Sequence, residues 1–256
     1  MRQYAFSRPD QPFLLAADID GTLLGDEIGE SLLRELALSD REGFLLAYIS
    51  GRSRASIFKL VDEGRLPRPD FVCGCVGTDL TDLRDPANAI GKKFISSVAP
   101  GWDLAMVYSQ GEGPGVQRQD FPDGQPPFHA GFFWDSEPAS LEAFRSRLDG
   151  LGAFNIYPAM NAYIDVIPVP LGKGGAVSHL QKELGIDKAL VVVAGDSGND
   201  LQMFETGFKG IIPVNALDEL KAAAVMDRHY LSPFPAALGV LDGLRHFGFL
   251  KAVDPG

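Results

Sequence analysis

The sequence predicts an α/β protein whose core is an open, mostly parallel sheet interrupted by a smaller inserted α/β segment. Short, continuously apolar runs of strand length alternate with helical patterns, as in sheets covered by helices on both faces. The middle of the chain is richer in proline and aromatic residues than its two ends. A chain of 256 residues is long enough for a core that carries such an insert.

The predicted core strands come from both ends of the chain. The apolar runs are Phe13 to Ala17, Phe44 to Ile49, Phe71 to Val76, Ala189 to Ala194 and Gly210 to Val214. Apolar residues at helical spacing predict helices over Glu30 to Ala37, over Ser53 to Asp62 and from about Ala176. We therefore assign residues 1–79 and 169–256 to the core and residues 80–168 to the insert, where segments such as Asn161 to Ile167 alternate apolar and polar side chains.

Composition narrows the classes of partner. A formal net charge of −11 and a pI near 4.8 argue against nucleic acid or an anionic membrane as a ligand. No apolar stretch approaches the ~20 residues that cross a bilayer, and the polar start lacks a signal-peptide core, so we expect a cytoplasmic protein. No obligate protein partner is inferred. Cys73 and Cys75 are read as small buried strand residues, and the four histidines show no metal-ligand grouping.

The first candidate catalytic motif, Asp18-Ile19-Asp20-Gly21-Thr22, follows the first predicted strand, and ligands of open α/β sheets bind at such strand ends. If strand geometry persists to Asp20, its period of two points both carboxylates the same way before Gly21 turns the chain. One carboxylate can attack phosphorus, while the other protonates the leaving oxygen and later deprotonates water. A Mg²⁺ ion would relieve their repulsion. Alone, an Asp-x-Asp pair could also be a loop or a helix cap.

Two further segments could bind phosphate. Ser50-Gly51-Arg52 follows the second strand, where a hydroxyl and the Gly51 N–H can donate to phosphate oxygens, although Ser50 could also cap the next helix. Lys173 lies in a glycine-rich turn before a helix, where it could neutralise phosphate charge and steady the nucleophile. A lone lysine in such a turn could instead be solvated.

The fourth segment, Gly195-Asp196-Ser197-Gly198-Asn199-Asp200, follows a clearly buried strand. Asp196 would emerge near the first carboxylate pair and complete an all-oxygen Mg²⁺ site. Asn199 and Asp200 could hold the metal's waters and orient Lys173. An ordinary turn and helix N-terminus is the alternative. These segments all follow a strand or open a helix, and together they point to phosphoryl transfer.

In these motifs the chain resembles the haloacid-dehalogenase-like hydrolase superfamily. The resemblance implies a Rossmann-like core with Asp18 as nucleophile, Asp20 as general acid/base, and Ser50 and Lys173 as phosphate-binding catalytic residues. It also implies Mg²⁺ held by Asp18, the Asp20 backbone carbonyl and Asp196. The insert is similar to the α/β cap of the subgroup that acts on sugar phosphates.

Within that subgroup the chain is most similar to sucrose-phosphate phosphatases, and mannosylfructose-phosphate phosphatase shares the pattern. The supporting segments are residues 50–53, 76–79, 195–205, 215–216, 228–230 and 246–250. The resemblance implies a phosphorylated small sugar as substrate. The chain also departs from the family pattern. Asp79 stands where glutamate is usual, and His129 and Gly131 replace a basic and a small hydroxyl residue in the aromatic cap strand. Asp165 matches the pattern.

Sugar recognition is expected in the cap. The candidates for binding sugar hydroxyls are His129, Asn161, Tyr163 and Asp165, while Ser50, Gly51, Arg52, Lys173 and Asn199 are expected to bind the phosphate end. Tyr163 could instead be structural on its strand, and His129 a satisfied edge residue.

Several other classes of protein share part of this set of motifs. A phosphoryl-accepting signalling module uses similar residues but needs neither the insert nor the closing acidic loop. A phosphomutase could share this core and return the phosphate to a sugar hydroxyl. Phosphatases for glycosylglycerol or glycosylglycerate phosphates are also compatible with the motifs. A glycosidase would need neither Lys173 nor Mg²⁺, and a P-loop kinase is excluded because no Gly-x-x-x-x-Gly-Lys-Ser/Thr is present.

Overall fold

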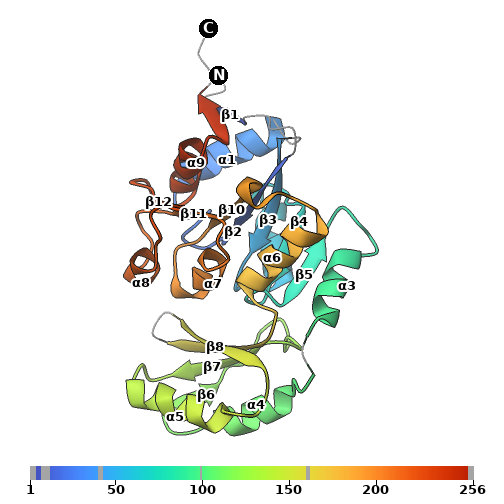
Figure 1. Cartoon of the computed structure of the whole chain (residues 1–256), viewed down its shortest axis with the longest axis vertical. Coiled ribbons are helices and arrows are strands. Elements are labelled where there is room, and N and C mark those ends of the chain that lie inside the picture. The colour runs from blue at the N-terminus through green and yellow to red at the C-terminus, as the bar shows by residue number, and fades with distance from the viewer. Residues whose placement is uncertain (1–3, 7–11, 40–42, 99, 160–161, 253–256) are drawn as a thin grey trace.

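The computed structural model describes residues 4–6, 12–39, 43–98, 100–159 and 162–252. It contains a large sheet at one end of the molecule and a smaller sheet at the other, with the chain crossing between them twice (Figure 1). A short antiparallel ribbon pairs β1 (Tyr4–Phe6) with β13 (Leu250–Ala252), close to the two termini. The predicted α/β architecture with an inserted second unit is confirmed.

The core sheet has seven strands in the order β12-β11-β10-β2-β3-β4-β5. Its neighbours pair in parallel except β4 and β5, which are antiparallel. The strands span His229–Leu231, Lys209–Ile212, Val191–Ala194, Phe13–Ala17, Phe44–Ile49, Phe71–Gly74 and Asp79–Asp82 in that order. Every residue of the central strand β2 is buried, which explains why its sequence is continuously apolar.

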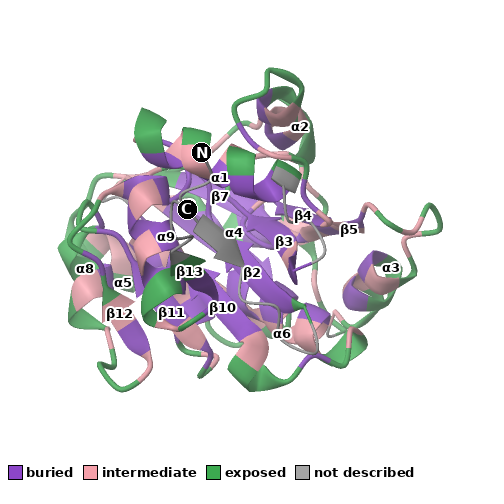
Figure 2. Cartoon of the chain, turned by 90° about the horizontal axis from the view of Figure 1, so that it is seen from above, coloured by how far each residue is buried: buried purple, intermediate pink, exposed green. Residues whose placement is uncertain are grey.

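Helices cover both faces of this sheet, as Figure 2 shows for α1 and α2 on one side and α6 on the other. Phe13, Leu15 and Ala17 pack with α1 (Glu27–Ser39), α2 (Arg54–Asp62) and α9 (Ala236–His246). The intervening Leu14 and Ala16 pack with α3 (Ala89–Ser96), α6 (Lys173–Glu183), α7 (Leu201–Phe204) and α8 (Asp218–Ala222). Short 3₁₀ turns span Lys188–Leu190 and Gly198–Asp200. Among the described helices, none has the length and apolar character needed to cross a membrane.

The inserted unit is a four-stranded antiparallel sheet in the order β6-β7-β9-β8. These strands span Val116–Arg118, Ala130–Trp134, Tyr163–Pro168 and Phe154–Ala159. Helices α4 (Leu104–Gly111) and α5 (Pro138–Leu148) cover the face that points away from the core, over a small apolar cluster that includes Phe132, Phe144 and Ile164. The opposite face of the sheet is turned toward the core (Figure 1).

Several expected boundaries are wrong. Strand β5 pairs with β4, so residues 80–82, which we assigned to the insert, belong to the core sheet. Neither β5 nor the short β12 was predicted, because strands of four and three residues carry too little periodicity. Helix α6 begins at Lys173 instead of near Ala176, since the glycines after Lys173 are helical. Helix α1 begins at Glu27 instead of Glu30.

The chain returns from the insert to the core by crossing the β4–β5 turn at very close range. The Gly172 N–H donates to the Gly77 carbonyl oxygen at 3.1 Å, and Gly77 has a φ of +87°. A Cβ on Gly77 would lie 2.2 Å from the carbonyl carbon of Gly172 and 2.3 Å from the nitrogen of Lys173. Only glycine permits this crossing, which sets where Lys173 enters the core.

We therefore expect Gly77→Ala to lower the free energy of unfolding by about 3 kcal/mol, because the left-handed backbone and a backbone clash both oppose the methyl group. Gly64→Ala is the matched control: Gly64 also has a positive φ of +69°, but nothing lies within 4 Å of its Cβ position. Its cost should be only about 1 kcal/mol. Urea denaturation measures both values, and equal costs would contradict the role of the crossing.

Candidate active site

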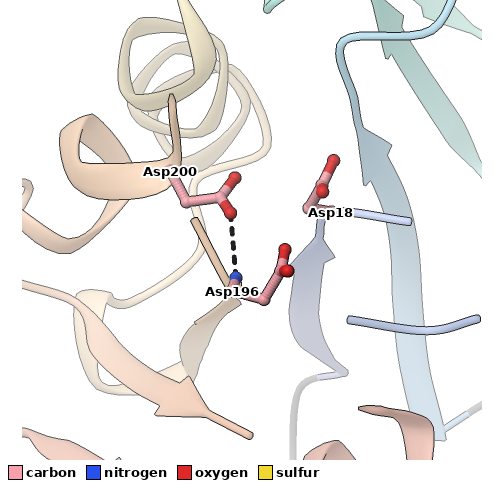
Figure 3. A group of neighbouring side chains, drawn as sticks. All are labelled: Asp18, Asp196 and Asp200. Carbon is pink, nitrogen blue, oxygen red and sulfur yellow. Dashed lines mark hydrogen bonds between the residues drawn. The ribbon is translucent and has the colours of Figure 1, made fainter. Parts of the chain in front are cut away.

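The predicted site residues meet at one edge of the core sheet. Asp18 follows β2, Ser50 follows β3 and Asp196 follows β10, and these three strands are neighbours in the order β10-β2-β3. The Asp18 N–H donates to the Ala194 carbonyl oxygen at 3.0 Å, which joins the ends of β2 and β10 directly. The side chains of Asp18, Asp196 and Asp200 converge in the space between them (Figure 3). Parallel strands thus bring residues from both halves of the chain to one place.

Lys173 lies at the centre of the site and is buried, with 1% of its side chain exposed. Its Nζ is 3.0 Å from Asp18 Oδ1 and 2.6 Å from Asp200 Oδ1, and it donates to Asn199 Oδ1 at 2.8 Å. The alternative of a solvated lysine is therefore wrong. Both carboxylates are buried too, so one buried ammonium lies between two buried carboxylates.

Asp200 also orders the loop that carries Asp196. Its Oδ2 accepts hydrogen bonds from the N–H groups of Asp196, at 2.9 Å, and Ser197, at 3.1 Å. Asp196 Oδ1 accepts from the Thr22 hydroxyl at 3.2 Å. A Cβ on Gly21 would lie 2.3 Å from Asp196 Oδ2, so glycine at this turn lets the two loops approach.

The three aspartates form a candidate metal centre. Asp18, Asp196 and Asp200 each place a carboxylate oxygen within 4.8 Å of the others. Oxygen-only donors of this kind suit a hard divalent cation. Because Asp200 is already engaged by Lys173 and two backbone N–H groups, Asp18 and Asp196 are the side chains best placed to hold the ion. The carboxylate of Asp20 is not part of this group.

The electrostatics of the group favour a bound cation. Burial raises the pKa of Asp18 to about 6, against the opposing effect of Lys173. Burial, with the nearby charges of Asp200 and Asp18, raises the pKa of Asp196 to about 7. Burial by itself lowers the pKa of Lys173, but Asp18 and Asp200 outweigh it and raise that pKa. The site therefore carries more negative charge than Lys173 neutralises.

Asp20 lies outside the aspartate group and is paired with an arginine. Strand β2 ends at Ala17, so strand geometry, the condition for two carboxylates that point the same way, does not continue as far as Asp20. Asp20 is instead held by Arg52 through a bidentate pair, with Nε to Oδ2 and Nη2 to Oδ1 both at 2.7 Å. Arg52, which we expected to bind substrate, thus binds Asp20, the predicted general acid/base.

Ser50 is 1% exposed, and its Oγ accepts the Arg52 N–H at 3.3 Å. It does not cap the following helix: α2 begins at Arg54, and Ser53 is the N-cap, accepting the Ser56 N–H at 3.1 Å. The hydroxyl of Ser50 therefore lies at the strand end with no capping role, and Gly51 beside it is exposed. Both lie at the sheet edge that also carries Asp18 and Asp196.

The predicted sugar-binding residues of the cap are engaged with one another. His129 Nε2 and Asp165 Oδ1 are 2.7 Å apart and both side chains are buried. Phe121 packs on the His129 ring with centroids 4.9 Å apart, and Tyr163 packs on Phe133. Asn161 lies outside the described residues. His129 and Asp165 thus form an internal pair of the cap sheet.

Three residues make supporting contacts that were not predicted. Thr22 binds Asp196, as described above. Asn215 donates to the Gly21 carbonyl oxygen at 2.8 Å and accepts the Ala236 N–H at 2.8 Å. Glu219 accepts the Gly198 N–H at 2.7 Å. Thr22 and Asn215 stood inside segments that support the family resemblance, but Glu219 acts across loops that no sequence period connects.

Comparison with known proteins identifies the family. The model of the sucrose-6F-phosphate phosphohydrolase family matches residues 11–248. The chain belongs to this family. It is 32% identical to mannosylfructose-phosphate phosphatase of Agrobacterium fabrum over 92% of this chain and 96% of that protein. The structure of sucrose-phosphatase from Synechocystis sp. PCC6803, in complex with sucrose and phosphate, superposes with a TM-score of 0.84 at 27% identity, covering 93% and 99% of the two chains.

Glucosylglycerol-phosphate synthase of Pseudomonas anguilliseptica is 31% identical over 93% of this chain, but the match spans only 31% of that longer protein. The resemblance to haloacid-dehalogenase-like hydrolases is confirmed, and the chain is a phosphatase of this superfamily. Phosphatases of the superfamily generally use a metal ion, and the aspartate group provides suitable ligands.

The raised carboxylate pKa values predict how a metal stabilises the protein. Without metal, the folded state holds protons that the unfolded chain releases above its pKa of 3.8. The resulting stability is complete below that pKa and is lost as the pH rises through about 6 and 7. We expect the increase in melting temperature on adding MgCl₂ to be larger at about pH 8 than at about pH 5.5, because the cation binds the ionised carboxylates. Scanning calorimetry tests this, and Asp196→Asn should abolish most of the difference.

Lys173→Met should destabilise the protein by about 3–5 kcal/mol near pH 8, because it leaves two buried carboxylates without their cation. Lys93→Met is the matched control, since Lys93 pairs with Glu183 at 2.7 Å but keeps 65% of its side chain exposed. Its loss should cost no more than about 1 kcal/mol. Urea denaturation at the same pH compares the two, and similar costs would contradict the central role of Lys173.

Proposed function

We propose that this protein is a Mg²⁺-dependent phosphatase that hydrolyses a sugar phosphate, a disaccharide phosphate of the sucrose 6-phosphate type, through an aspartyl phosphate on Asp18. The observation that carries the proposal is the buried contact of Lys173 with Asp18, beside Asp196, at the sheet edge where Ser50 also ends its strand. This arrangement holds a carboxylate ready while supplying positive charge for an incoming phosphate.

In the proposed reaction Asp18 attacks phosphorus in line with the departing sugar oxygen, which Asp20 protonates. Asp20 then deprotonates a water molecule that cleaves the aspartyl phosphate. Lys173, the Ser50 hydroxyl and the Gly51 N–H stabilise charge on the transferring group. A Mg²⁺ ion on Asp18, Asp196 and the Asp20 carbonyl would supply further positive charge. Asn199 and Asp200 act by holding Lys173.

The insert supports a substrate with a sugar leaving group. We propose that it acts as a cap. The face of its sheet that is turned toward the core would cover the catalytic edge, the edge of the core sheet that carries Asp18, Ser50 and Asp196, and exclude water from it. The relatives named above are a mannosylfructose-phosphate phosphatase and a sucrose-phosphatase, which favours a disaccharide phosphate. The match within a glucosylglycerol-phosphate synthase makes a glycosylglycerol phosphate the second candidate. The net charge of −11 argues against a nucleic acid as the substrate.

A substrate panel tests the proposal. It contains sucrose 6-phosphate, mannosylfructose phosphate, glucosylglycerol phosphate and simple hexose phosphates, each with MgCl₂ and with EDTA. We expect phosphate release to require Mg²⁺ and to be fastest with one glycosyl phosphate. Chromatography of the products distinguishes hydrolysis from a phosphomutase, which would yield an isomeric sugar phosphate and no free phosphate. Equal rates with and without Mg²⁺ would contradict the proposal.

Asp18→Asn should abolish turnover, lowering kcat by at least about 10⁴-fold, because the amide cannot attack phosphorus. The variant should remain folded, since the amide has nearly the same volume. Asp62→Asn, an exposed change on α2, is the matched control and should leave kcat unchanged. Rapid-quench detection of acid-stable phosphoprotein in wild type, absent from Asp18→Asn, tests the intermediate directly. Residual activity near wild type would refute Asp18 as nucleophile.

A further inference from the structure

The helix that begins at the buried lysine is capped by a side chain from another helix. Helix α6 starts at Lys173, and its N-cap is Gly172, which has no side chain to accept a hydrogen bond from the first turn. The amide of Gln202, in α7, takes this place, because its Oε1 accepts the Gly174 N–H at 2.8 Å. The N–H groups of a first turn have no partner within their helix, so an acceptor from outside stabilises that turn.

We propose that Gln202 is a positioning residue of the active site, which fixes the start of α6 and hence Lys173, and which ties that start to the cap through Tyr157. The proposal rests on the role of Lys173 in the function proposed above. Gln202 Nε2 donates to the hydroxyl of Tyr157, on cap strand β8, at 2.8 Å. Because the Gly174 N–H can only donate, the amide oxygen must face it, and the amide nitrogen is left for the tyrosine.

The short segment of residues 199–202 holds Lys173 at both of its ends. Asn199 and Asp200 accept hydrogen bonds from Nζ at 2.8 Å and 2.6 Å, while Gln202 binds the backbone one residue further along α6. A lysine side chain is long and flexible, so its ammonium group keeps a fixed place only if the backbone is fixed as well. A displacement of about 1 Å in a catalytic group is enough to slow a reaction substantially.

The glycines on either side of Lys173 make room for Gln202. A Cβ on Gly172 would lie 2.4 Å from Gln202 Oε1, and a Cβ on Gly174 would lie 2.3 Å from the Gln202 carbonyl oxygen. Both distances are far inside van der Waals contact. Glycine is a poor residue for a helical turn, so close packing of α7 explains why this helix begins with Lys-Gly-Gly.

Tyr157 belongs to the cap but packs on the core. Its ring lies against the apolar cluster of the core that includes Leu171 and Met203, and its strand contacts the Gly198–Asp200 turn. Burial raises the pKa of Tyr157 to about 12, so the hydroxyl stays neutral and accepts the amide N–H at the pH of ordinary assays. A displacement of the cap at this contact would therefore move the amide that caps α6.

The first experiment compares two substitutions of Gln202. Gln202→Met keeps the length of the side chain without a hydrogen-bond acceptor, whereas Gln202→Glu keeps an oxygen for the Gly174 N–H and can accept the Tyr157 hydroxyl. The substrates, assayed with MgCl₂, are the disaccharide phosphate that wild type hydrolyses fastest and p-nitrophenyl phosphate. We expect Gln202→Met to lower kcat/KM about tenfold on both, because Lys173 serves the step that they share. Gln202→Glu should stay within about threefold of wild type.

Gln181→Met is the matched control. Gln181 also lies on α6, is half-buried like Gln202, and donates from Nε2 to the Ile186 carbonyl oxygen at 2.6 Å. Its loss should lower the melting temperature about as much as that of Gln202 but change kcat/KM by less than about twofold. Equal losses of kcat/KM in the two methionine variants would overturn the proposal, because general loosening of α6 would explain both.

The second experiment tests the link to the cap. Tyr157→Phe keeps the packed ring and removes the hydroxyl. We expect it to lower kcat/KM about threefold in the wild-type background and to cause no further loss when combined with Gln202→Met, because the hydroxyl acts through the amide. Independent losses that multiply in the double variant would overturn the link to the cap.

The outcomes separate this proposal from the proposed function. If wild type releases phosphate from no ester in a Mg²⁺-dependent way, the proposed function is overturned, and the role of Gln202 with it. If wild type is active and Gln202→Met is unimpaired, only the positioning role is overturned. Equal impairment of Gln202→Met and Gln202→Glu would also overturn it, since the acceptor oxygen would then make no difference.

Discussion

The structure of the catalytic edge depends on one buried ammonium group. Lys173, at the start of α6, contacts two carboxylates through its Nζ. Asp18 follows β2, and Asp200 lies in the loop after β10. A buried carboxylate is stable in ionised form only when a cation and hydrogen bonds compensate its loss of water. Lys173 provides this for both residues, and Asp200 in turn orders the backbone of Asp196. The crossing at Gly77 is what delivers Lys173 to that position.

The same contact leaves the site with an excess of negative charge, which explains how an acidic chain can act on an anion. One ammonium cannot neutralise three aspartates, and the pKa values of Asp18 and Asp196 rise as a result of burial and of their neighbours. A divalent cation held by Asp18 and Asp196 would complete the charge balance and supply positive charge for a phosphate group. Specificity is then a separate problem, which we assign to the cap in the proposed function. In the proposed division of labour the core handles the phosphoryl group and the cap reads the sugar.

Much of the core sheet and of the candidate site could be predicted, because short stretches of the sequence determine them. The buried strands β2, β3 and β10 are short apolar runs, and parallel strands place their carboxyl ends at one edge. Asp18, Ser50 and Asp196 follow such runs directly, so their convergence follows from the sheet. The insert was recognisable from its composition and from its alternating apolar and polar segments. The bounds of helices and strands were harder to predict. Strands β5 and β12 are too short to show a period, and the glycines in the first turn of α6 did not indicate a helix.

The sequence by itself determined which catalytic side chains are present and which strands they follow. The tertiary structure decided the partners of each side chain: that Arg52 grips Asp20, that Ser53 instead of Ser50 caps α2, and that His129 binds Asp165. It also decided that the loop of residues 119–128 lies over β7, where Gly131 leaves room for it. These contacts join segments that are far apart in the chain, and their geometry depends on how loops and sheets pack, which no local period of the sequence encodes.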